Sequence, residues 1–392
     1  MKSNSEIFDE VPAAAPDSGK NRALDGSCSQ TDDLAAERIA ALESVTGNRL
    51  TPRLRRLADE YARDQLGDIE FARFLYDYCV IYGGFEEGWL TYQYFRKILV
   101  KPGGIGLEKL SKIKTFSNLI LKTDAMPDIG YYLHGRFYDR EMRPATLESL
   151  KQILREVKSE EVYVKPDGSV LGESIYRVSL ETLDDAFFTE KRNAVIQCAV
   201  TQHASFEDIV SDSLATIRIL TGRTVSGDIK PMAAYVRFGM TGTQWIVSSQ
   251  CVRVAIVDAA GTLDECGYTS DWKSWRQHPN TGASFAGRTV PLFAEAIEFC
   301  LALHRSVPHP ILVGWDIAVD AEAQLKLLEW NADHCEIRFS EAVSGPCFAG
   351  LRWQVSDHQQ RQRCRHLLVN ADDEPVTGPA SEQPVSFNPE NS

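Results

Sequence analysis

The sequence VGWDIAVDAEAQLKLLEWNAD, residues 313–333, decides how the rest of the chain is interpreted. Two short apolar segments flank a polar turn at 320–324, and this pattern predicts a β-hairpin. Three polar side chains interrupt the apolar segments: Asp316, Glu329 and Asn331. Because side chains alternate between the two faces of a strand, Glu329 and Asn331 point the same way, and a hairpin can bring Asp316 opposite them.

These three side chains predict a metal site. Two carboxylates and an amide oxygen on one face form a cluster of hard oxygen ligands, which suits Mg²⁺. Without a cation, the two acids would repel each other and lose solvation. The alternative is a hairpin whose acids face water, but the flanking residues are apolar, and buried acids are rarely left unpaired. We therefore expect Asp316, Glu329 and Asn331 to bind a metal ion.

The spacing of these residues resembles the metal site of the ATP-grasp superfamily, where an Asp followed by Glu-x-Asn binds the Mg²⁺ ions that hold the nucleotide phosphates. Glu329 lies thirteen positions after Asp316. The opening GWDIAV is similar to one branch in particular, the sugar-transfer-associated ATP-grasp proteins. The resemblance implies an α+β protein with the ATP-grasp fold, in which two α/β lobes with antiparallel sheets grip ATP. A helical N-terminal region precedes that fold here.

The composition is that of a globular chain. Its 392 residues can bury a substantial core in about two or three subdomains. A net charge of −13 without a basic tract argues against nucleic acid as a partner, although a few local cations and Mg²⁺ suffice for a nucleotide. The cysteines are odd in number, scattered and without a C-x-x-C pair, which indicates a reducing cytoplasm. We expect a cytoplasmic protein without a membrane span, because no stretch of about eighteen apolar residues occurs.

Changes in composition and periodicity divide the chain into five parts. Residues 1–33 predict a disordered lead, and the polar, Pro-rich residues 370–392 predict a disordered tail. Residues 34–110 carry apolar side chains at three-to-four spacing, which predicts a helical N-terminal region. The resemblance divides the remainder into a nucleotide-binding subdomain at 111–200 and a catalytic subdomain at 201–369. The helical region is better explained as a wall of the core than as a partner surface, and a homodimer stays open.

A strand, a glycine-rich turn and a second strand are predicted at 161–178. Gly168 and Gly172 would let backbone amides approach an anion closely, and Lys165 supplies a point charge for phosphate. An ordinary glycine hairpin is the alternative. The Lys-Pro pair before a glycine-rich loop resembles the ATP-grasp phosphate loop, which implies that Lys165, Gly168, Ser169 and Gly172 bind ATP.

Upstream of this loop, the sequence from Leu107 predicts a helix that ends near Met126. In ATP-grasp enzymes a helix of this kind carries a lysine that contacts the nucleotide. Lys112 and Lys114 both match this position by resemblance, and the sequence does not choose between them. Two solvated helix lysines are an equally good interpretation. The amphipathic segment 145–157 predicts a further helix.

Residues 193–200 (NAVIQCAV) predict an apolar strand. The resemblance identifies its end with the interdomain hinge whose backbone pairs with adenine, and Gln197, Cys198 and Ala199 would occupy that hinge. Many relatives carry an acid where this chain has Gln197. A cysteine on a buried strand is usually a core residue, so no reactivity is expected of Cys198. His203 matches a histidine that follows the hinge, and it completes the expected ATP-binding set.

Arginines interrupt the next two predicted strands. Arg218 alternates with Ile217 and Ile219, which puts it on the opposite face of its strand. Such an arginine either pairs with a carboxylate or faces a ligand, and Arg237 repeats the arrangement on the next strand. Together they could clamp a phosphoryl group or a substrate carboxylate. The resemblance favours a catalytic role for both.

Two later segments concern the substrate. After Arg237 the branch often carries an Asp-Asn pair and glycines, whereas this chain has QWIVSSQCVRVAIV. Residues 276–291 are similar to a His-Pro loop of the branch, which implies a substrate loop with His278, Asn280 and Gly282. That loop could close over a substrate or bind phosphate, and a packed Ω-loop is the alternative.

Together these features imply a site where Mg²⁺ and basic groups hold ATP between two lobes. In ATP-grasp ligases, phosphorylation of a carboxylate gives an acyl phosphate, and an amine then displaces the phosphate. We expect an ATP-dependent carboxylate–amine ligase that releases ADP and phosphate, with a role in polysaccharide or secondary-metabolite biosynthesis by family association. The alternatives are an ATP-grasp phosphotransferase acting on a hydroxyl and a non-catalytic, nucleotide-binding regulatory protein. The sequence does not disclose the acid or the amine.

Overall fold

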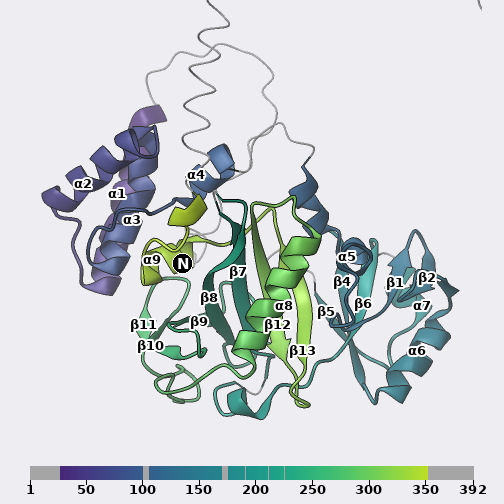
Figure 1. Ribbon diagram of the computed structural model, residues 1–392. Helices are drawn as coiled ribbons and strands as arrows, with labels where there is room; N and C mark the ends of the chain where they lie inside the picture. Colours follow the sequence, from purple (N-terminus) through teal and green to yellow (C-terminus); the bar gives the residue numbers. More distant parts are fainter. Residues whose placement is uncertain are drawn as a thin grey trace, which may run out of the picture.

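Helices and two antiparallel sheets make up the chain, as expected for an α+β protein with a helical region ahead of the sheets. The computed structural model describes residues 27–99, 106–169, 175–189, 191–210, 212–224 and 226–351. Figure 1 shows helices α1–α3 on one side, the larger sheet in the middle and the smaller sheet on the other side. The predicted tail at 370–392 and most of the predicted lead lie outside the described residues.

In chain order, the N-terminal region consists of α1 (Ser27–Thr46), α2 (Pro52–Asp64), the 3₁₀ helix η2 (Ile69–Phe71), α3 (Ala72–Tyr82), α4 (Tyr92–Tyr94) and the π-helix η3 (Phe95–Leu99). α1 begins within the predicted lead. α2 begins after Thr51, whose side chain accepts a hydrogen bond from the amide of Leu54. α3 ends at Gly83 in a left-handed conformation (φ 81°), which glycine adopts at little cost.

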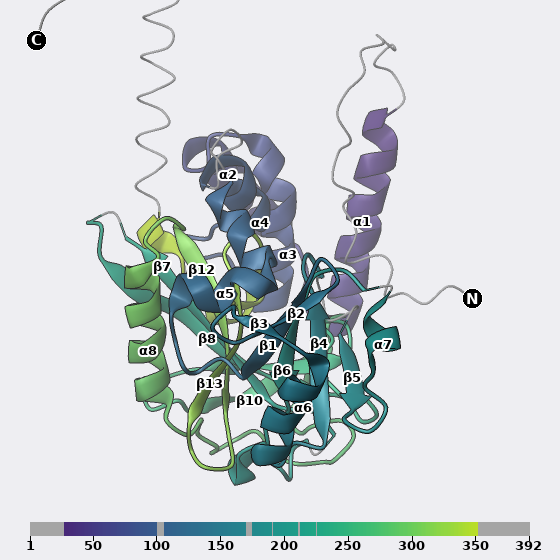
Figure 2. The ribbon, with the colours of Figure 1, turned by 90° about the vertical axis from the view of Figure 1, so that its right-hand side faces the viewer.

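The smaller sheet has the strand order β3-β2-β1-β6-β4-β5, with antiparallel neighbours throughout. Its strands are β1 (Asp128–Leu133), β2 (Arg136–Asp139), β3 (Pro144–Ala145), β4 (Glu161–Pro166), β5 (Tyr176–Ser179) and β6 (Ala194–Cys198). The sequence predicted β4, β5 and β6 but not β1–β3. Helices α6 (Leu147–Glu156) and α7 (Asp185–Thr189) pack on this sheet. α6 lies on its outer side, away from the larger sheet (Figure 2).

The helix predicted from Leu107 to Met126 is broken and shorter than expected. It consists of a 3₁₀ helix, η4 (Leu107–Lys112), and an α-helix, α5 (Lys114–Leu121). Ile113 separates them with a non-helical backbone (φ −93°, ψ 84°), and Lys122 ends α5 in the left-handed region (φ 48°). Residues 122–126, which were predicted to complete the helix, instead form a turn that leads to β1, and β1 pairs with β6 in the centre of the smaller sheet.

The larger sheet has the order β11-β10-β9-β8-β7-β12-β13. Its strands are β7 (Thr216–Arg223), β8 (Ile229–Gly239), β9 (Cys251–Ile256), β10 (Leu263–Tyr268), β11 (Ser274–Trp275), β12 (Leu312–Val319) and β13 (Leu325–Asn331). The predicted hairpin is therefore β12–β13. Asp320 fixes its turn, because one carboxylate oxygen accepts the amides of Glu322 (3.1 Å) and Gln324 (2.7 Å).

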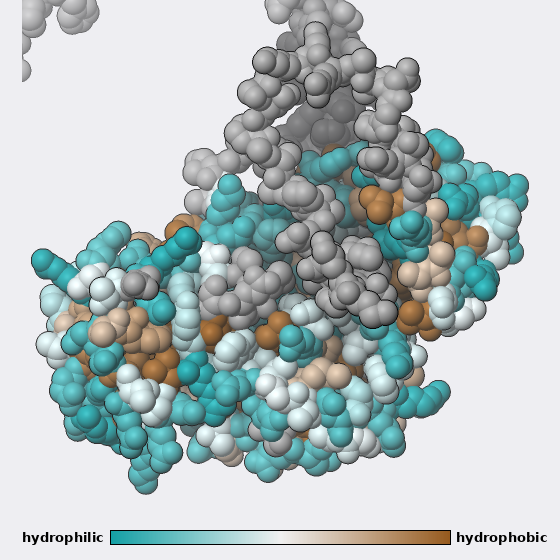
Figure 3. Space-filling view, turned by 180° about the vertical axis from the view of Figure 1, so that it is seen from behind, coloured by the Kyte–Doolittle hydropathy of each residue, from teal (hydrophilic) through white to brown (hydrophobic). Residues whose placement is uncertain are grey.

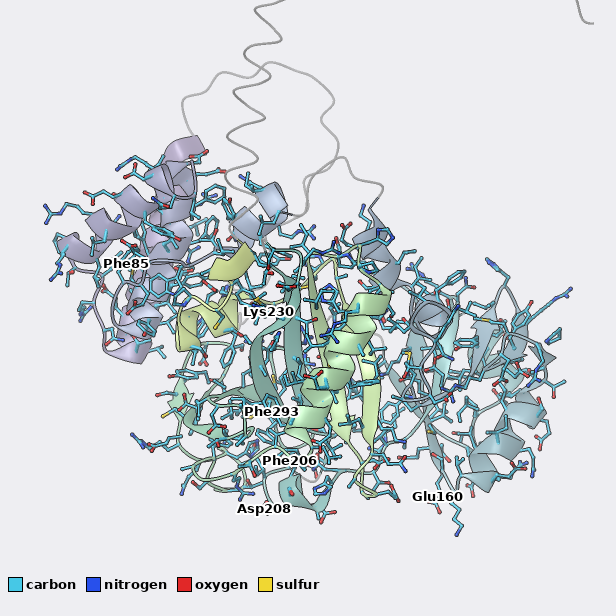
Figure 4. The ribbon with its side chains drawn as sticks, in the orientation of Figure 1. Phe85, Glu160, Phe206, Asp208, Lys230 and Phe293 are labelled. Carbon is cyan, nitrogen blue, oxygen red and sulfur yellow. The ribbon has the colours of Figure 1, made fainter. Side chains whose placement is uncertain are left out.

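The two faces of the larger sheet pack against different partners. One face packs on α8 (Phe293–Ser306) and on the short helix η5 (Ala204–Phe206), in a core that contains Ile217, Trp315 and Phe206. Figure 4 shows Phe206 and Phe293 at the same end of the sheet, with Phe85 among the N-terminal helices and Glu160 at the edge of the smaller lobe. The polar side chains discussed below leave the opposite face.

That opposite face shares a core with the N-terminal helices. Leu220 and Tyr235 of the sheet belong to one apolar cluster with residues of α1, α2 and α3 and with α9 (Arg338–Ser344). The short helix η6 (Ala349–Leu351) adds Leu351 to the same cluster. The helical region therefore acts as a wall over the face that carries the site.

Glu341 of α9 ties the N-terminal helical region to the C-terminal part of the described chain. Its carboxylate is fully buried and accepts the amides of Leu90 (2.8 Å) and Phe348 (2.9 Å). Leu90 belongs to the segment between α3 and α4, so one carboxylate joins the helical region to the C-terminal part of the described chain.

Figure 3 shows hydrophilic side chains over much of the surface seen from behind, with hydrophobic ones in separate small patches. Within the described residues, no helix combines the length and the apolar character needed to cross a membrane.

We predict that Glu341→Ala destabilises the protein by about 2–4 kcal/mol, because it leaves two buried amides without acceptors. Denaturant unfolding followed by circular dichroism measures the loss. Glu298→Ala, at an exposed position on α8, is the matched control and should change stability by less than about 0.5 kcal/mol. Equal midpoints for the two variants would show that the contacts of Glu341 with Leu90 and Phe348 do not stabilise the fold.

Candidate functional site

The predicted metal residues lie on one face of the β12–β13 hairpin. Asp316 is directly opposite Glu329, and Gly314 is opposite Asn331, so all three polar side chains share a face. The register of the β12–β13 pair shifts between Asp316 and Ile317, so the irregularity of the hairpin lies directly after Asp316. The structure thus brings together the three residues that the sequence singled out.

Arg218 on β7 lies next to Asp316 across the sheet. Its Nε lies 2.5 Å from Asp316 Oδ1, and its Nη2 lies 3.0 Å from Oδ2, which makes a bidentate ion pair. Arg237 Nη2 reaches the same Oδ1 at 2.7 Å. Gly314 gives Arg218 the space it needs, because a Cβ there would lie 3.1 Å from its Nη1.

Burial and charge oppose each other at Asp316. Burial alone would raise the pKa of Asp316, but Arg218 and Arg237 outweigh it and hold this pKa below its usual range. Conversely, burial would lower the pKa of Arg218, and Asp316 raises it instead. Arg237 Nε is buried without a hydrogen-bond partner among the described residues. Asp316 is therefore ionised and held by two arginines.

Lys114 and Lys112 have different surroundings. Lys114 is buried, and its Nζ lies 2.7 Å from the carbonyl of Ser169 and 3.3 Å from Glu329 Oε1. It therefore connects the predicted phosphate loop to the hairpin. Lys112 Nζ instead lies 2.5 Å from Asp333 Oδ2, and its side chain is one-third exposed. Of the two, Lys114 is the lysine that faces both the loop and the acid.

The predicted phosphate loop follows β4. Gly168 has φ 71°, which favours glycine, and its amide donates to the carbonyl of Lys112 (2.8 Å). The Ser169 hydroxyl donates to the carbonyl of Pro166 (2.7 Å). Gly172 lies outside the described residues. The described part of the loop is thus fixed against η4 and α5.

Lys165 stands at the end of β4, close to this loop. Burial lowers the pKa of Lys165, and this effect is opposed by Glu329, Asp128 and Asp316 and reinforced by Lys114. The side chain therefore lies in the field of the hairpin acids as well as that of the smaller sheet. A lysine in such a place is a candidate for contact with a phosphate, whose charge would restore its usual pKa.

The predicted hinge is at the end of β6. Gln197 is buried, and its Nε2 donates to Asp128 Oδ1 at 2.8 Å. The amide of Cys198 donates to the carbonyl of Pro127 (2.9 Å), and that of Ala199 reaches Ser159 Oγ at 3.4 Å. Burial raises the pKa of the Cys198 thiol, in agreement with an unreactive core residue.

The sequence did not single out Asp128. It is buried at the start of β1, where it also accepts a hydrogen bond from Tyr131 (3.0 Å). Burial raises its pKa, although the bonds from Gln197 and Tyr131 act in the opposite direction. A buried carboxyl beside the predicted hinge is a candidate contact for a nucleotide base, but β1 itself was missed, so no sequence signal placed this residue.

The remaining predicted residues make contacts within the protein. His203 precedes η5, and its Nδ1 accepts the amide of Ser205 (3.2 Å). His278 is buried, with Nε2 3.1 Å from the carbonyl of Gly239. Burial lowers the pKa of His278.

The rest of the predicted substrate loop is held in the same way. Asn280 Oδ1 accepts the amide of Thr241 (2.9 Å). Gly282 takes φ 72° and donates its amide to the carbonyl of His278 (2.8 Å). These contacts fix the loop at the end of β8, two residues beyond Arg237.

The sequence also missed a contribution from the N-terminal helices. Arg96, in the π-helix η3, donates to Asp333 Oδ1 at 2.9 Å. Burial would raise the pKa of Asp333, but Lys112 and Arg96 hold it below its usual range. Asp333 follows Asn331 by two positions, so the helical region braces the loop next to the predicted metal site. The proximity of Asp333 to the Glu-x-Asn pattern was a usable signal, whereas nothing local pointed to Arg96.

The donor set of the hairpin fits Mg²⁺. No three His, Cys, Asp or Glu side chains gather as a metal site in the part of the chain that the structure describes. The hairpin instead offers two acids and an amide, all oxygen donors on one face. The acids are balanced by protein cations, since Asp316 pairs with two arginines and Glu329 lies beside Lys114. A metal ion at this position would therefore compete with these cations for the same oxygens.

The site thus combines Lys114 and Lys165 with acids and arginines of the larger sheet. A comparison with protein families shows that the sugar-transfer associated ATP-grasp family matches residues 151–355, just over half of the chain. The chain therefore belongs to the sugar-transfer associated ATP-grasp family. The match includes Lys165, both arginines and the whole β12–β13 hairpin.

Solved structures similar to this chain include the ATP-grasp ligase PsnB complexed with minimal precursor (13% identity, 62% of this chain, 60% of that chain, TM-score 0.36). A second is the D-alanine-D-alanine ligase from Coxiella burnetii, with 9% identity over 67% of this chain and 62% of that chain and a TM-score of 0.35. A third is a biotin carboxylase from Campylobacter jejuni, with 11% identity over 64% of this chain and 47% of that chain and a TM-score of 0.40. The chain spans less than two thirds of the length of each of these proteins. No curated protein matches.

We predict that Lys114→Gln weakens ATP binding by about tenfold to a hundredfold, because a charge-assisted phosphate contact contributes about 1.5–3 kcal/mol. Lys112→Gln should weaken it less than threefold. Isothermal titration calorimetry with Mg·ATP measures both. A larger loss for Lys112→Gln would reverse the assignment.

We also predict that ATP binding depends on pH through Lys165. Its lowered pKa means that the ammonium is lost at a lower pH than the usual value of about 10.4. ATP affinity should therefore fall as the pH rises through this lowered pKa, with proton uptake on binding. Lys165→Arg stays charged and should remove this pH dependence; an unchanged profile in that variant would contradict the prediction.

Proposed function

We propose that this protein is an ATP-dependent carboxylate–amine ligase that forms an amide through an acyl phosphate and releases ADP and phosphate. The observation that supports it best is the position of Lys114 at the start of α5. Its ammonium contacts the carbonyl of Ser169 in the loop after β4 and the carboxylate of Glu329 on β13. Family membership supports ATP as a substrate. The proposed partners are a small carboxylic acid and a small amine.

The proposed residues have separate tasks. Lys114, Lys165 and the loop at Gly168 and Ser169 would hold the ATP phosphates, and Gln197–Ala199 would flank the base. Asp316, Glu329 and Asn331 would hold Mg²⁺, which supplies charge compensation for the phosphate oxygens when it is bound. Lys112 is proposed to act through Asp333, and His203, His278, Asn280 and Gly282 are proposed to support the surrounding loops.

Arg218 and Arg237 are the proposed catalytic residues. An oxygen of the acceptor carboxylate attacks the γ-phosphorus, the bond to the bridging oxygen breaks, and ADP leaves. The amine nitrogen then attacks the acyl carbon, phosphate leaves with the bonding electron pair, and the nitrogen loses a proton. Two fixed guanidinium groups would stabilise the charge that develops on the phosphoryl and acyl oxygens.

A phosphotransferase that acts on a hydroxyl is the second candidate, because the same lysines and acids would serve phosphoryl transfer. A non-catalytic nucleotide-binding protein is the third. The paired arginines favour the ligase, because a carboxylate acceptor and an acyl phosphate both present oxygens that guanidinium groups bind in pairs.

The test is release of ADP and phosphate from Mg·ATP with a panel of amino acids, amino sugars and uronic acids, followed by mass spectrometry. We predict release that requires both an acid and an amine and yields a condensed mass. A phosphorylated alcohol would establish the phosphotransferase instead, and ATP binding without turnover across the panel would favour the regulatory protein.

Arg218→Lys is the variant that tests the arginine assignment. A lysine keeps the charge but loses the bidentate geometry, so we predict that kcat falls about a hundredfold or more. Arg177→Lys is the control, because Arg177 lies on the edge strand β5 of the smaller sheet and pairs with Glu161 of β4. Equal rates in the two variants would contradict a catalytic role for Arg218.

A further inference from the structure

The loop after β13 receives contacts from the N-terminal helices. Arg96 of η3 donates from Nη1 to the main-chain carbonyl of Asp333, and the same nitrogen donates to Asp333 Oδ1 at 2.9 Å. Asp333 is buried and lies two residues after Asn331, a proposed metal residue. Arg96 therefore holds both the main chain and the side chain of a residue close to the proposed metal site.

A second contact joins the same two parts of the chain. Tyr92 of α4 has its Oη 2.5 Å from His334 Nδ1, and the two rings stack with planes 24° apart. Tyr92 and Arg96 therefore bind consecutive residues of the loop. The helix that contains Arg96 is a π-helix, a rare form that is frequent at functional sites.

The other contacts of this loop come from η4. The amide of Ala332 donates to Ser111 Oγ at 3.1 Å. Lys112 Nζ lies 2.5 Å from Asp333 Oδ2, but the lysine side chain is one-third exposed. Loss of the Lys112 ammonium would leave both bonds of Arg96 in place, whereas loss of Arg96 would remove the bond to the main chain of Asp333.

The position of the Asn331 side chain depends on this loop. β13 ends at Asn331, and Asn331 Nδ2 lies 3.5 Å from Asp316 Oδ2, which is at the limit of a hydrogen bond. Among the described residues, no shorter side-chain hydrogen bond fixes this amide. Mg²⁺ requires near-ideal octahedral geometry, with oxygens at about 2.0–2.1 Å. A small shift of residues 332–334 would therefore disturb the oxygens that are proposed to bind Mg²⁺.

We propose that Arg96 is a positioning residue for the Mg·ATP site and that it couples the N-terminal helical region to nucleotide binding. This inference rests on the proposed ATP site, but not on the reaction that follows binding. Arg96 lies outside residues 151–355, which the family matches. Because coupling between two sites is reciprocal, Mg·ATP should also stabilise the segment that contains Arg96.

Calorimetric titration of the full chain with Mg·ATP tests the first part. We predict that Arg96→Gln weakens binding about fivefold or more, the lower range of coupling between sites. Arg96→Lys keeps the charge without the planar guanidinium, so it should restore part of the affinity. It is also the variant to use if Arg96→Gln does not fold.

A double-mutant cycle tests whether Arg96 acts through the metal residue. In a chain that carries Asn331→Ala, the further change Arg96→Gln should weaken Mg·ATP binding by less than about twofold, because the oxygen that Arg96 positions is already gone. An undiminished further loss in that background would overturn the positioning role.

Arg38→Gln is the matched control. Arg38 Nε lies 3.0 Å from Oδ1 of the buried Asp77, so this change also removes an arginine from a buried acid, but within the N-terminal helices. It should change Mg·ATP affinity by less than about twofold. Thermal unfolding of all variants shows whether they are folded.

Hydrogen–deuterium exchange tests the reciprocal effect. Mg·ATP should slow amide exchange in residues 92–99 of the wild type and of Arg38→Gln, but not of Arg96→Gln. If Arg96 only stabilised the fold, its loss would speed exchange equally with and without Mg·ATP.

Equal Mg·ATP affinities for Arg96→Gln and Arg38→Gln, or exchange in the wild type that Mg·ATP does not slow, would overturn this proposal. The ligase proposal fails by a different result, the absence of an amide product in the turnover assay. Neither binding nor exchange requires that product, so the two failures are distinguishable.

Discussion

The buried carboxylate of Asp316 constrains everything around it. It lies on β12, between β7 and the edge strand β13, with two arginines on its oxygens, and a buried charge of this kind is costly unless it is paired. The pair joins β12 to β7, where Asp316 is directly opposite Arg218, and a Cβ at position 314 would lie only 3.1 Å from Arg218 Nη1. Under the proposed function, Arg218 and Arg237 would contact the transferred phosphoryl group, so a bound ligand would replace Asp316 as the partner of cations that are already in place.

The segment η4–α5 makes hydrogen bonds to both sheets. Trp330 Nε1 of β13 donates to Ser117 Oγ (3.1 Å), and the amide of Ala332 donates to Ser111 Oγ (3.1 Å). On its other side, Thr115 donates to Asp167 after β4. This segment therefore links the two sheets, and its Lys114 contacts both the loop after β4 and Glu329 of β13. The N-terminal helices close the remaining side through Arg96 and Asp333.

The sequence predicted the β12–β13 hairpin and its three polar residues, because a period-two pattern and a short turn are local properties. It also found Arg218, since an arginine in an apolar strand is conspicuous. It missed β1–β3, where a helical pattern ran into an unrecognised strand, and it could not place Arg96, whose partner is far away in the sequence.

The most direct measurement is a crystal structure with Mg²⁺ and a non-hydrolysable ATP analogue. The account predicts phosphate oxygens within hydrogen-bond reach of Lys114 and Lys165, with Mg²⁺ on oxygens of Asp316, Glu329 and Asn331 and with Arg218 or Arg237 shifted from Asp316 toward the γ-phosphate. A nucleotide bound elsewhere, or bound here with the ion pairs of Asp316 unchanged and no metal on the hairpin, would contradict it.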